Sequence, residues 1–196
     1  MVTEIPDSET ENLESTTDIP VLSDQSRNFQ LETEGQISDG IEALNQIPEI
    51  HSDRWEQLHE EQERLSALQD VEDRMANIQG RPRVSIESVP MPENMFGGWD
   101  GESIKVNRDH LMGEQPVMEN VDTIIHEGRH AYQDYAISHP EIISDPGVVE
   151  TWSDNMQDYK DIQTYGPEIY QDQPVERDAW SYATAIQQGV YGHKGS

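Results

Sequence analysis

The chain contains no cysteine, which excludes disulfide bonds, zinc sites built from thiolates and catalysis by a cysteine nucleophile. Basic residues are scarce, with 12 Lys and Arg against 40 Asp and Glu, and the formal net charge is -28. Such a field repels the phosphates of nucleic acids and of anionic membranes, so we expect neither as a partner. The charge is typical of a solvated acidic surface or of a protein with a basic partner.

Long apolar runs are missing as well. No stretch approaches the ~20 apolar residues that a membrane-spanning helix requires. The N-terminus also lacks a basic region followed by an apolar one, which would mark a Sec signal peptide. We therefore expect a soluble protein that is cytoplasmic as synthesised, or that is secreted as an effector by a route without a Sec signal.

The N-terminal segment differs in composition from the rest of the chain. Residues 1–38 are rich in Glu, Asp, Ser and Thr, with Arg27 as their only base. Their few apolar residues show no period, and such a segment cannot bury enough surface to offset the entropy lost on ordering. The sequence predicts a disordered acidic tail over 1–38 and one domain over 39–196, which is long enough to bury a core.

The domain is expected to be mainly helical with a small sheet. A short helix is predicted near residues 41–44, and apolar residues with a 3.6 spacing predict a long helix over 52–77. Residues 83–89 alternate as a strand does, and 95–107 have the pattern of a β-hairpin with a glycine-rich tip. Because the edge of such a sheet can bind an extended peptide, the hairpin is a candidate substrate site.

The most informative motif is His126-Glu127-x-x-His130, in a mostly apolar stretch that predicts a buried helix ending before Pro140. Histidines four residues apart share one helix face and can bind one Zn²⁺, whereas the glutamate beside the first reaches a water on the metal. Zinc lowers the pKa of that water to about 7. Glu127 then acts as general base and passes the proton to the leaving amine.

Glu176 is the favoured third ligand of this predicted zinc site. It follows Pro174, which suits the start of a helix, and Ala179 and Ala183 lie one and two turns beyond it. Small side chains on that face let the helix approach the histidine helix closely, which directs Glu176 at the metal.

Glu150 is the alternative third ligand. Nineteen residues separate it from His130, and Glu150 with Asp154 resembles the Glu-x-x-x-Asp spacing of thermolysin-like enzymes. Prolines break the intervening helix, however, and this resemblance ends with the spacing. The metzincin class is excluded, because Gln133 and Ala136 occupy the positions of its glycine and its third histidine.

The flanks of the motif resemble a known family. In chain order they are a long helix, Gly80-Arg81-Pro82, a strand, a hairpin ending Ile104-x-Val106-Asn107, residues 123–133 around the motif, a Trp152…Asn155…Tyr159 stretch and residues 173–179. This order resembles the small gluzincin-type zinc metallopeptidase domains of bacterial polymorphic toxins and effectors. The Glu-x-x-Ala-x-x-Tyr-Ala pattern at 176–183 is also similar to the zinc-peptidase regulators of the ImmA/IrrE group.

The resemblance covers roughly residues 50–190 and implies an α+β, zincin-like fold, with a small sheet beside the metal-binding helix. It also implies that His126, His130 and Glu176 are the zinc ligands and that Glu127 is the general base. The expected function is therefore that of a zinc-dependent endopeptidase acting on a protein or peptide substrate.

Other roles near the site stay open in the sequence. Tyr165, Tyr170 and Tyr182 are candidate hydrogen-bond donors to the transition state, although each also fits a packing role. Asp154 or Asp178 can orient a ligand histidine by accepting a hydrogen bond from its ring.

Two other functions compete with the peptidase. One is an ImmA-like regulatory protease that cleaves a repressor, and the other is a non-catalytic, zinc-stabilised protein that binds a peptide along the hairpin. A purely structural zinc site needs no base and usually has four protein ligands, so Glu127 favours the enzyme.

Overall fold

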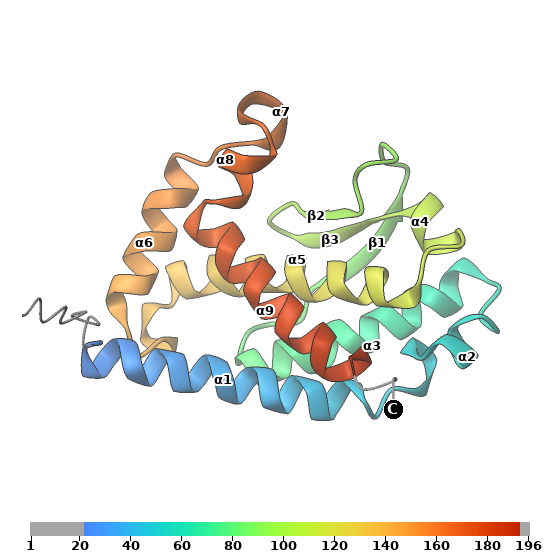
Figure 1. Ribbon diagram of the computed structural model, residues 1–196, viewed down its shortest axis with the longest axis horizontal. Coiled ribbons are helices and arrows are strands. Elements are labelled where there is room, and N and C mark those ends of the chain that lie inside the picture. The colour runs from blue at the N-terminus through green and yellow to red at the C-terminus, as the bar shows by residue number, and fades with distance from the viewer. Residues whose placement is uncertain (1–21, 193–196) are drawn as a thin grey trace, which may run out of the picture.

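The computed structural model describes residues 22–192 and has an α+β architecture that is mainly helical, with one three-stranded sheet. Helix α5 (Val117–Ser138) runs through the middle of the molecule, with the sheet on one side and α3 (Glu61–Gln79) on another (Figure 1). Helix α9 (Pro174–Tyr191) crosses α5, and α1 (Asp24–Leu44) packs along α9 and α3. The predicted coarse class is therefore confirmed.

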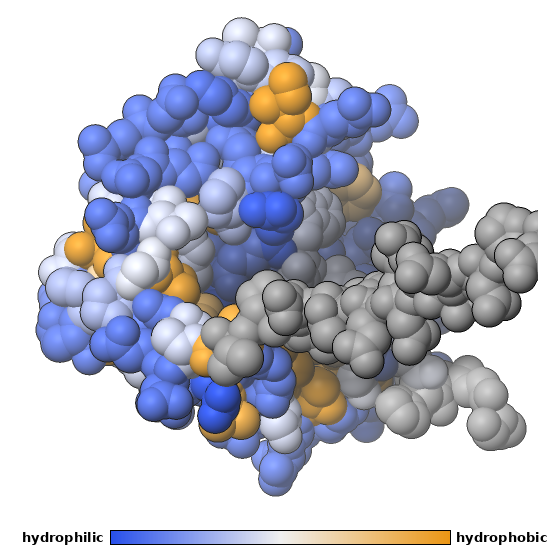
Figure 2. Space-filling view, turned by 60° about the vertical axis from the view of Figure 1, so that its left-hand side comes forward, coloured by the Kyte–Doolittle hydropathy of each residue, from blue (hydrophilic) through white to orange (hydrophobic). Residues whose placement is uncertain are grey.

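Shorter helices connect these elements. They are η1 (Pro48–Ile50), α2 (Ser52–Trp55), α4 (Arg108–Met112), η2 (Pro140–Ile142), α6 (Pro146–Gln157), α7 (Ile162–Tyr165) and α8 (Pro167–Gln171). Among residues 22–192, no helix is both long enough and apolar enough to cross a membrane. The face drawn in Figure 2 is mostly hydrophilic with scattered apolar patches, as the acidic composition leads one to expect.

Helix α1 corrects the predicted tail. It begins at Asp24 behind an N-cap formed by Ser23, so the boundary predicted at residue 38 is wrong, and the predicted short helix is only the end of α1. Residues 1–21 lie outside the described part of the chain. The apolar stripe of α1 is hard to see in the sequence because Gln36 and Gly40 interrupt it. Gln36 instead accepts a hydrogen bond from the buried Arg129 at 3.0 Å.

The helix predicted over 52–77 is two helices, α2 and α3, separated by a turn. Glu60 caps α3 in a reciprocal capping box with Glu63, whose carboxylate also accepts from the backbone of His59. The capping bonds replace the helical ones, so the chain turns here although the apolar spacing continues. Gly80, with φ of 68°, ends α3 in the left-handed conformation that glycine adopts at low cost.

The sheet has the strand order β1-β3-β2 and confirms both the strand and the hairpin. Strand β1 (Ser85–Val89) runs parallel to β3 (Ser103–Asn107), which pairs antiparallel with β2 (Gly97–Trp99). A side chain on Gly97 would place its Cβ 2.5 Å from the Thr123 side chain of α5. Glycine at this position therefore allows the edge strand β2 to lie directly on α5.

A buried ion pair lies against another glycine of α5. Arg81 donates two hydrogen bonds of 2.7 Å to Glu72, and both side chains are almost completely buried. A Cβ on Gly128 would lie 2.9 Å from the Arg81 guanidinium and 3.1 Å from the Glu72 carboxylate. The missing side chain makes room for this ion pair beside the motif.

Two glycine-to-alanine substitutions separate helix propensity from packing. Gly35→Ala in α1 meets no atom within 4 Å, and we expect it to raise the free energy of unfolding by about 0.5–1 kcal/mol. Gly128→Ala should instead lower it by about 1–3 kcal/mol, because the added methyl displaces a guanidinium held by its hydrogen bonds. Urea denaturation measures both, and a stabilised Gly128→Ala protein would contradict the packing argument.

Candidate metal centre

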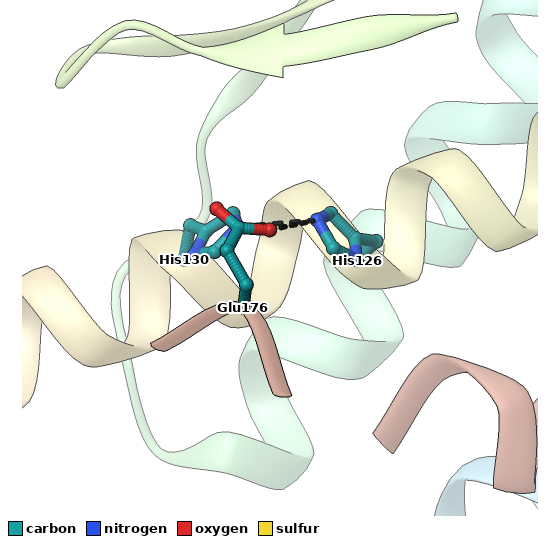
Figure 3. Close-up of side chains that lie close together, drawn as sticks. All are labelled: His126, His130 and Glu176. Atoms are coloured by element: carbon teal, nitrogen blue, oxygen red, sulfur yellow. Dashed lines mark hydrogen bonds and ion pairs between the residues drawn. The ribbon is translucent and has the colours of Figure 1, made fainter. Parts of the chain in front are cut away.

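Three buried side chains from two helices converge at one point. His126 and His130 lie one turn apart on α5, and Glu176 lies in the first turn of α9, which crosses it (Figure 3). The two Nε2 atoms are 3.1 Å apart, and each lies 3.4 Å from a different oxygen of Glu176. One ligand atom from each residue fits within 4.8 Å of the others, which is the compactness that a single ion requires.

The orientation of His130 is set by Gln133. The Gln133 amide donates to the carbonyl of Val175 at 3.0 Å and to Asp178 at 2.7 Å, which leaves its oxygen facing His130 Nδ1 at 2.8 Å. Because that oxygen only accepts, Nδ1 carries the proton, and in the neutral ring Nε2 has a free lone pair. Gln133 therefore prepares the Nε2 atom of His130 for a metal.

Two polar atoms at this point lack hydrogen-bond partners among the described residues. They are Oε2 of Glu176, whose side chain is completely buried, and Nδ1 of His126. A buried carboxylate oxygen without a donor costs about 1–3 kcal/mol, and a cation in contact with the carboxylate would remove this cost. Two imidazole nitrogens and a carboxylate also form a donor set that suits zinc and leaves a fourth position for a water molecule.

The charged forms of Glu176 and His130 stabilise each other. Burial works to raise the pKa of the Glu176 carboxyl, but the nearby imidazoles of His126 and His130 outweigh it and hold that pKa well below its usual range. Burial likewise works to lower the pKa of His130. Its hydrogen bond to Glu176 and the charges of Glu127 and Glu176 outweigh burial and raise the pKa to about 9. The carboxylate is thus anionic, and it attracts either a proton on His130 or a metal ion in its place.

An ion pair fixes α9 to α5 beside the metal centre. Arg129 is completely buried and donates to both oxygens of Asp178, at 2.8 and 3.0 Å. Its guanidinium also lies over the rings of Tyr132 and Tyr182, at 4.6 and 4.4 Å from their centroids. Asp178 is two residues beyond Glu176, so this bond sets where Glu176 meets the histidines.

Glu127 lies on the side of the sheet beside His126, His130 and Glu176, which are called the metal group below because they could hold an ion. It is half-buried, and a Cβ built on Gly97 of β2 would lie 3.8 Å from its Cγ. Two contacts hold the hairpin in this place. The indole of Trp99 donates to Asp134 of α5 at 2.6 Å, and buried Asn107 donates to the carbonyl of Met95 just before β2 at 2.7 Å. The predicted base thus lies between the histidines and an edge strand.

Tyr159 belongs to a stretch that carries the family resemblance, but the sequence pattern gave it no role at the site. Its hydroxyl donates to Oε1 of Glu176 at 2.5 Å, and burial together with that carboxylate raises the pKa of Tyr159, so the hydroxyl keeps its proton. Tyr170, one of the three predicted donors, stands edge-on to Tyr159 with ring centroids 6.1 Å apart. Tyr165 is exposed, and Tyr182 packs against Arg129. The segment between α6 and α7 carries Tyr159 to the site, and no local spacing indicates this.

The structure also places the other predicted residues. Glu150 is exposed on α6 and does not belong to the metal group, so the alternative third ligand lies away from the histidines. Asp154 is exposed on α6 as well and does not belong to the metal group. Asp178 accepts from Gln133 rather than from a histidine, so it orients His130 through one intermediate side chain.

No model of a protein family, no curated protein and no solved structure matches this chain.

Metal retention tests whether Glu176 or Glu150 is the third ligand. After purification in the presence of zinc, Glu150→Gln should keep about one zinc ion per chain, as the wild type should. Glu176→Gln should lose it, because an amide binds zinc far more weakly than a carboxylate does. Elemental analysis of the dialysed proteins measures the zinc content. The assignment of Glu176 is wrong if Glu150→Gln is the variant that loses the metal.

Proposed function

We propose that this protein is a zinc-dependent endopeptidase with a zincin-like fold, in which His126, His130 and Glu176 hold the metal and Glu127 is the general base. The observation that carries the proposal is the convergence of these buried ligands from two helices, with a half-buried carboxylate beside them at an edge strand. The toxin or effector setting and the ImmA-like regulatory role stay predictions from the sequence.

Peptide hydrolysis at this site would use the bound metal, Glu127 and Tyr159 in different roles. A bound zinc ion would polarise the scissile carbonyl and lower the pKa of a water molecule to about 7. Glu127 accepts the proton of that water and then delivers it to the leaving amine. The hydroxyl of Tyr159 donates to Glu176 and, from this position, can turn its hydrogen bond toward the developing oxyanion.

The edge strand provides a binding surface for the peptide. Strand β2 pairs with β3 on one side only, so its other side offers backbone donors and acceptors to an extended chain. A Cβ on Gly98 would meet no atom within 4 Å, so the surface of β2 is open at this residue. Because Gly97 lies against Glu127, a peptide added along β2 would bring one of its carbonyls close to Glu127 and to the histidine next to it.

The Glu127→Gln variant separates an enzyme from a zinc-stabilised binding protein. We expect it to keep the zinc content of the wild type and to lose at least about 10²-fold in the rate of cleavage, because the amide cannot accept a proton. The measurement is digestion of a broad protein mixture and a peptide library, analysed by mass spectrometry. Glu150→Gln is the matched control and should cleave at the wild-type rate; equal cleavage by Glu127→Gln would refute the mechanism.

Tyr159→Phe tests the hydrogen-bond donor. With a peptide that the wild type cleaves, kcat should fall about 10²-fold while KM stays within a few fold, because the lost bond acts in the transition state. Tyr165→Phe, at an exposed tyrosine of α7, is the control for the region and should leave both constants unchanged. A change confined to KM would show that Tyr159 binds the substrate and has no role in the chemical step.

A further inference from the structure

An exposed tryptophan stands beside the metal group. Trp180 lies on α9 one turn beyond Glu176, and its ring contacts that of His126, with centroids 4.6 Å apart. Trp180 is nevertheless 40% exposed, although it is a large aromatic residue. One part of the indole therefore supports a predicted metal ligand, and the rest is open to a substrate that reaches the metal.

The neighbouring surface of α5 is acidic and has no cation of its own. Glu119, Asp122 and Glu127 form no ion pair with another residue of the described range 22–192. Asp122 lies one turn before His126. Burial raises the pKa of its carboxyl, and this outweighs the opposing effect of His126, while the charge of Glu119 adds to the increase. A half-buried carboxylate in this position is stabilised by a positive charge supplied from outside.

Basic side chains on α5, on α9 and in the segment before α7 are already paired. Arg129 on α5 binds Asp178, and Arg177 on α9 binds Asp172. Lys160, next to Tyr159, binds Asp158. The charge that would complement Asp122 is therefore not available from these elements.

We propose that Trp180 is a specificity-determining residue that, with Asp122, accepts an arginine or lysine side chain adjacent to the scissile bond of the substrate. The aliphatic stem of such a side chain packs on the indole, and its cation is attracted both by the aromatic face and by the carboxylate. We place the basic residue of the substrate next to the scissile bond because Trp180 contacts His126, which would hold the metal. This inference rests on the proposed peptidase function and names its substrate class.

Binding to a catalytically inactive protein tests the preference independently of cleavage. The probe is a set of end-blocked extended peptides that differ at one central position, which is Arg, Lys, Leu, Phe or Glu. Their affinities for zinc-loaded Glu127→Gln protein are measured by fluorescence anisotropy. We expect the Arg and Lys peptides to bind about tenfold more tightly than the Leu peptide, and the Glu peptide to bind most weakly.

A second substitution in the Glu127→Gln protein tests which residues cause the preference for Arg and Lys peptides. Trp180→Ala and Asp122→Asn should each remove most of the ratio between the Arg and Leu peptides, and Trp180→Phe should retain part of it because the aromatic face remains. Tyr165→Ala and Asp154→Asn, an exposed aromatic and an exposed acid elsewhere, are the matched controls and should leave the ratio unchanged. Zinc content and thermal unfolding confirm that each variant keeps its site and its fold.

The outcomes separate this inference from the function on which it rests. Tighter binding of Leu or Phe peptides, an unchanged ratio in Trp180→Ala, or no binding of any peptide would overturn the role of Trp180. The wild type cleaving the peptide library without regard to basic residues would overturn it too, while the peptidase function stands. Absence of all cleavage by the wild type, with the Arg preference intact in binding, would overturn the peptidase function alone.

Discussion

The bond between Arg129 and Asp178 is the constraint on which the site depends. A completely buried guanidinium must be paired, and Asp178 on α9 is the partner that neutralises it. The same carboxylate accepts from Gln133, whose oxygen faces His130. One buried charge therefore fixes the approach of α9 to α5, the protonated nitrogen of a histidine and, two residues along, the position of Glu176.

Two glycines without side chains allow other parts of the structure to pack closely against the remaining sides of α5. Gly128 makes room for the buried pair of Arg81 and Glu72, and Gly97 lets the edge strand lie on the helix. The motif is thus surrounded by α3, α9 and the hairpin, and the half-exposed Glu127 lies where the sheet edge meets the helix. An extended peptide along β2 would bring its backbone to that position, and the proposed peptide hydrolysis rests on this arrangement.

Much of the fold follows from local patterns. The apolar stretch around the motif, ended by a proline, predicts α5; alternation and glycines predict the hairpin; and Pro174 predicts the start of α9. Prediction fails where side chains distant in sequence decide the conformation. Helix α1 has a polar Gln36 in its buried stripe because its partner Arg129 is buried and charged. The break before α3 depends on a capping box that competes with a continuous apolar pattern.

The sequence by itself determined the chemical types at the site: two histidines on one helix face, a glutamate between them, and a second glutamate near a helix start. Periodicity and capping act over a few residues, so these features can be read locally. Only the tertiary structure decided that Glu176 and not Glu150 meets the histidines, and that Tyr159 and Trp180 stand beside them. The helix crossing that brings them together is set by a buried charge pair between residues 49 positions apart, which no local pattern encodes.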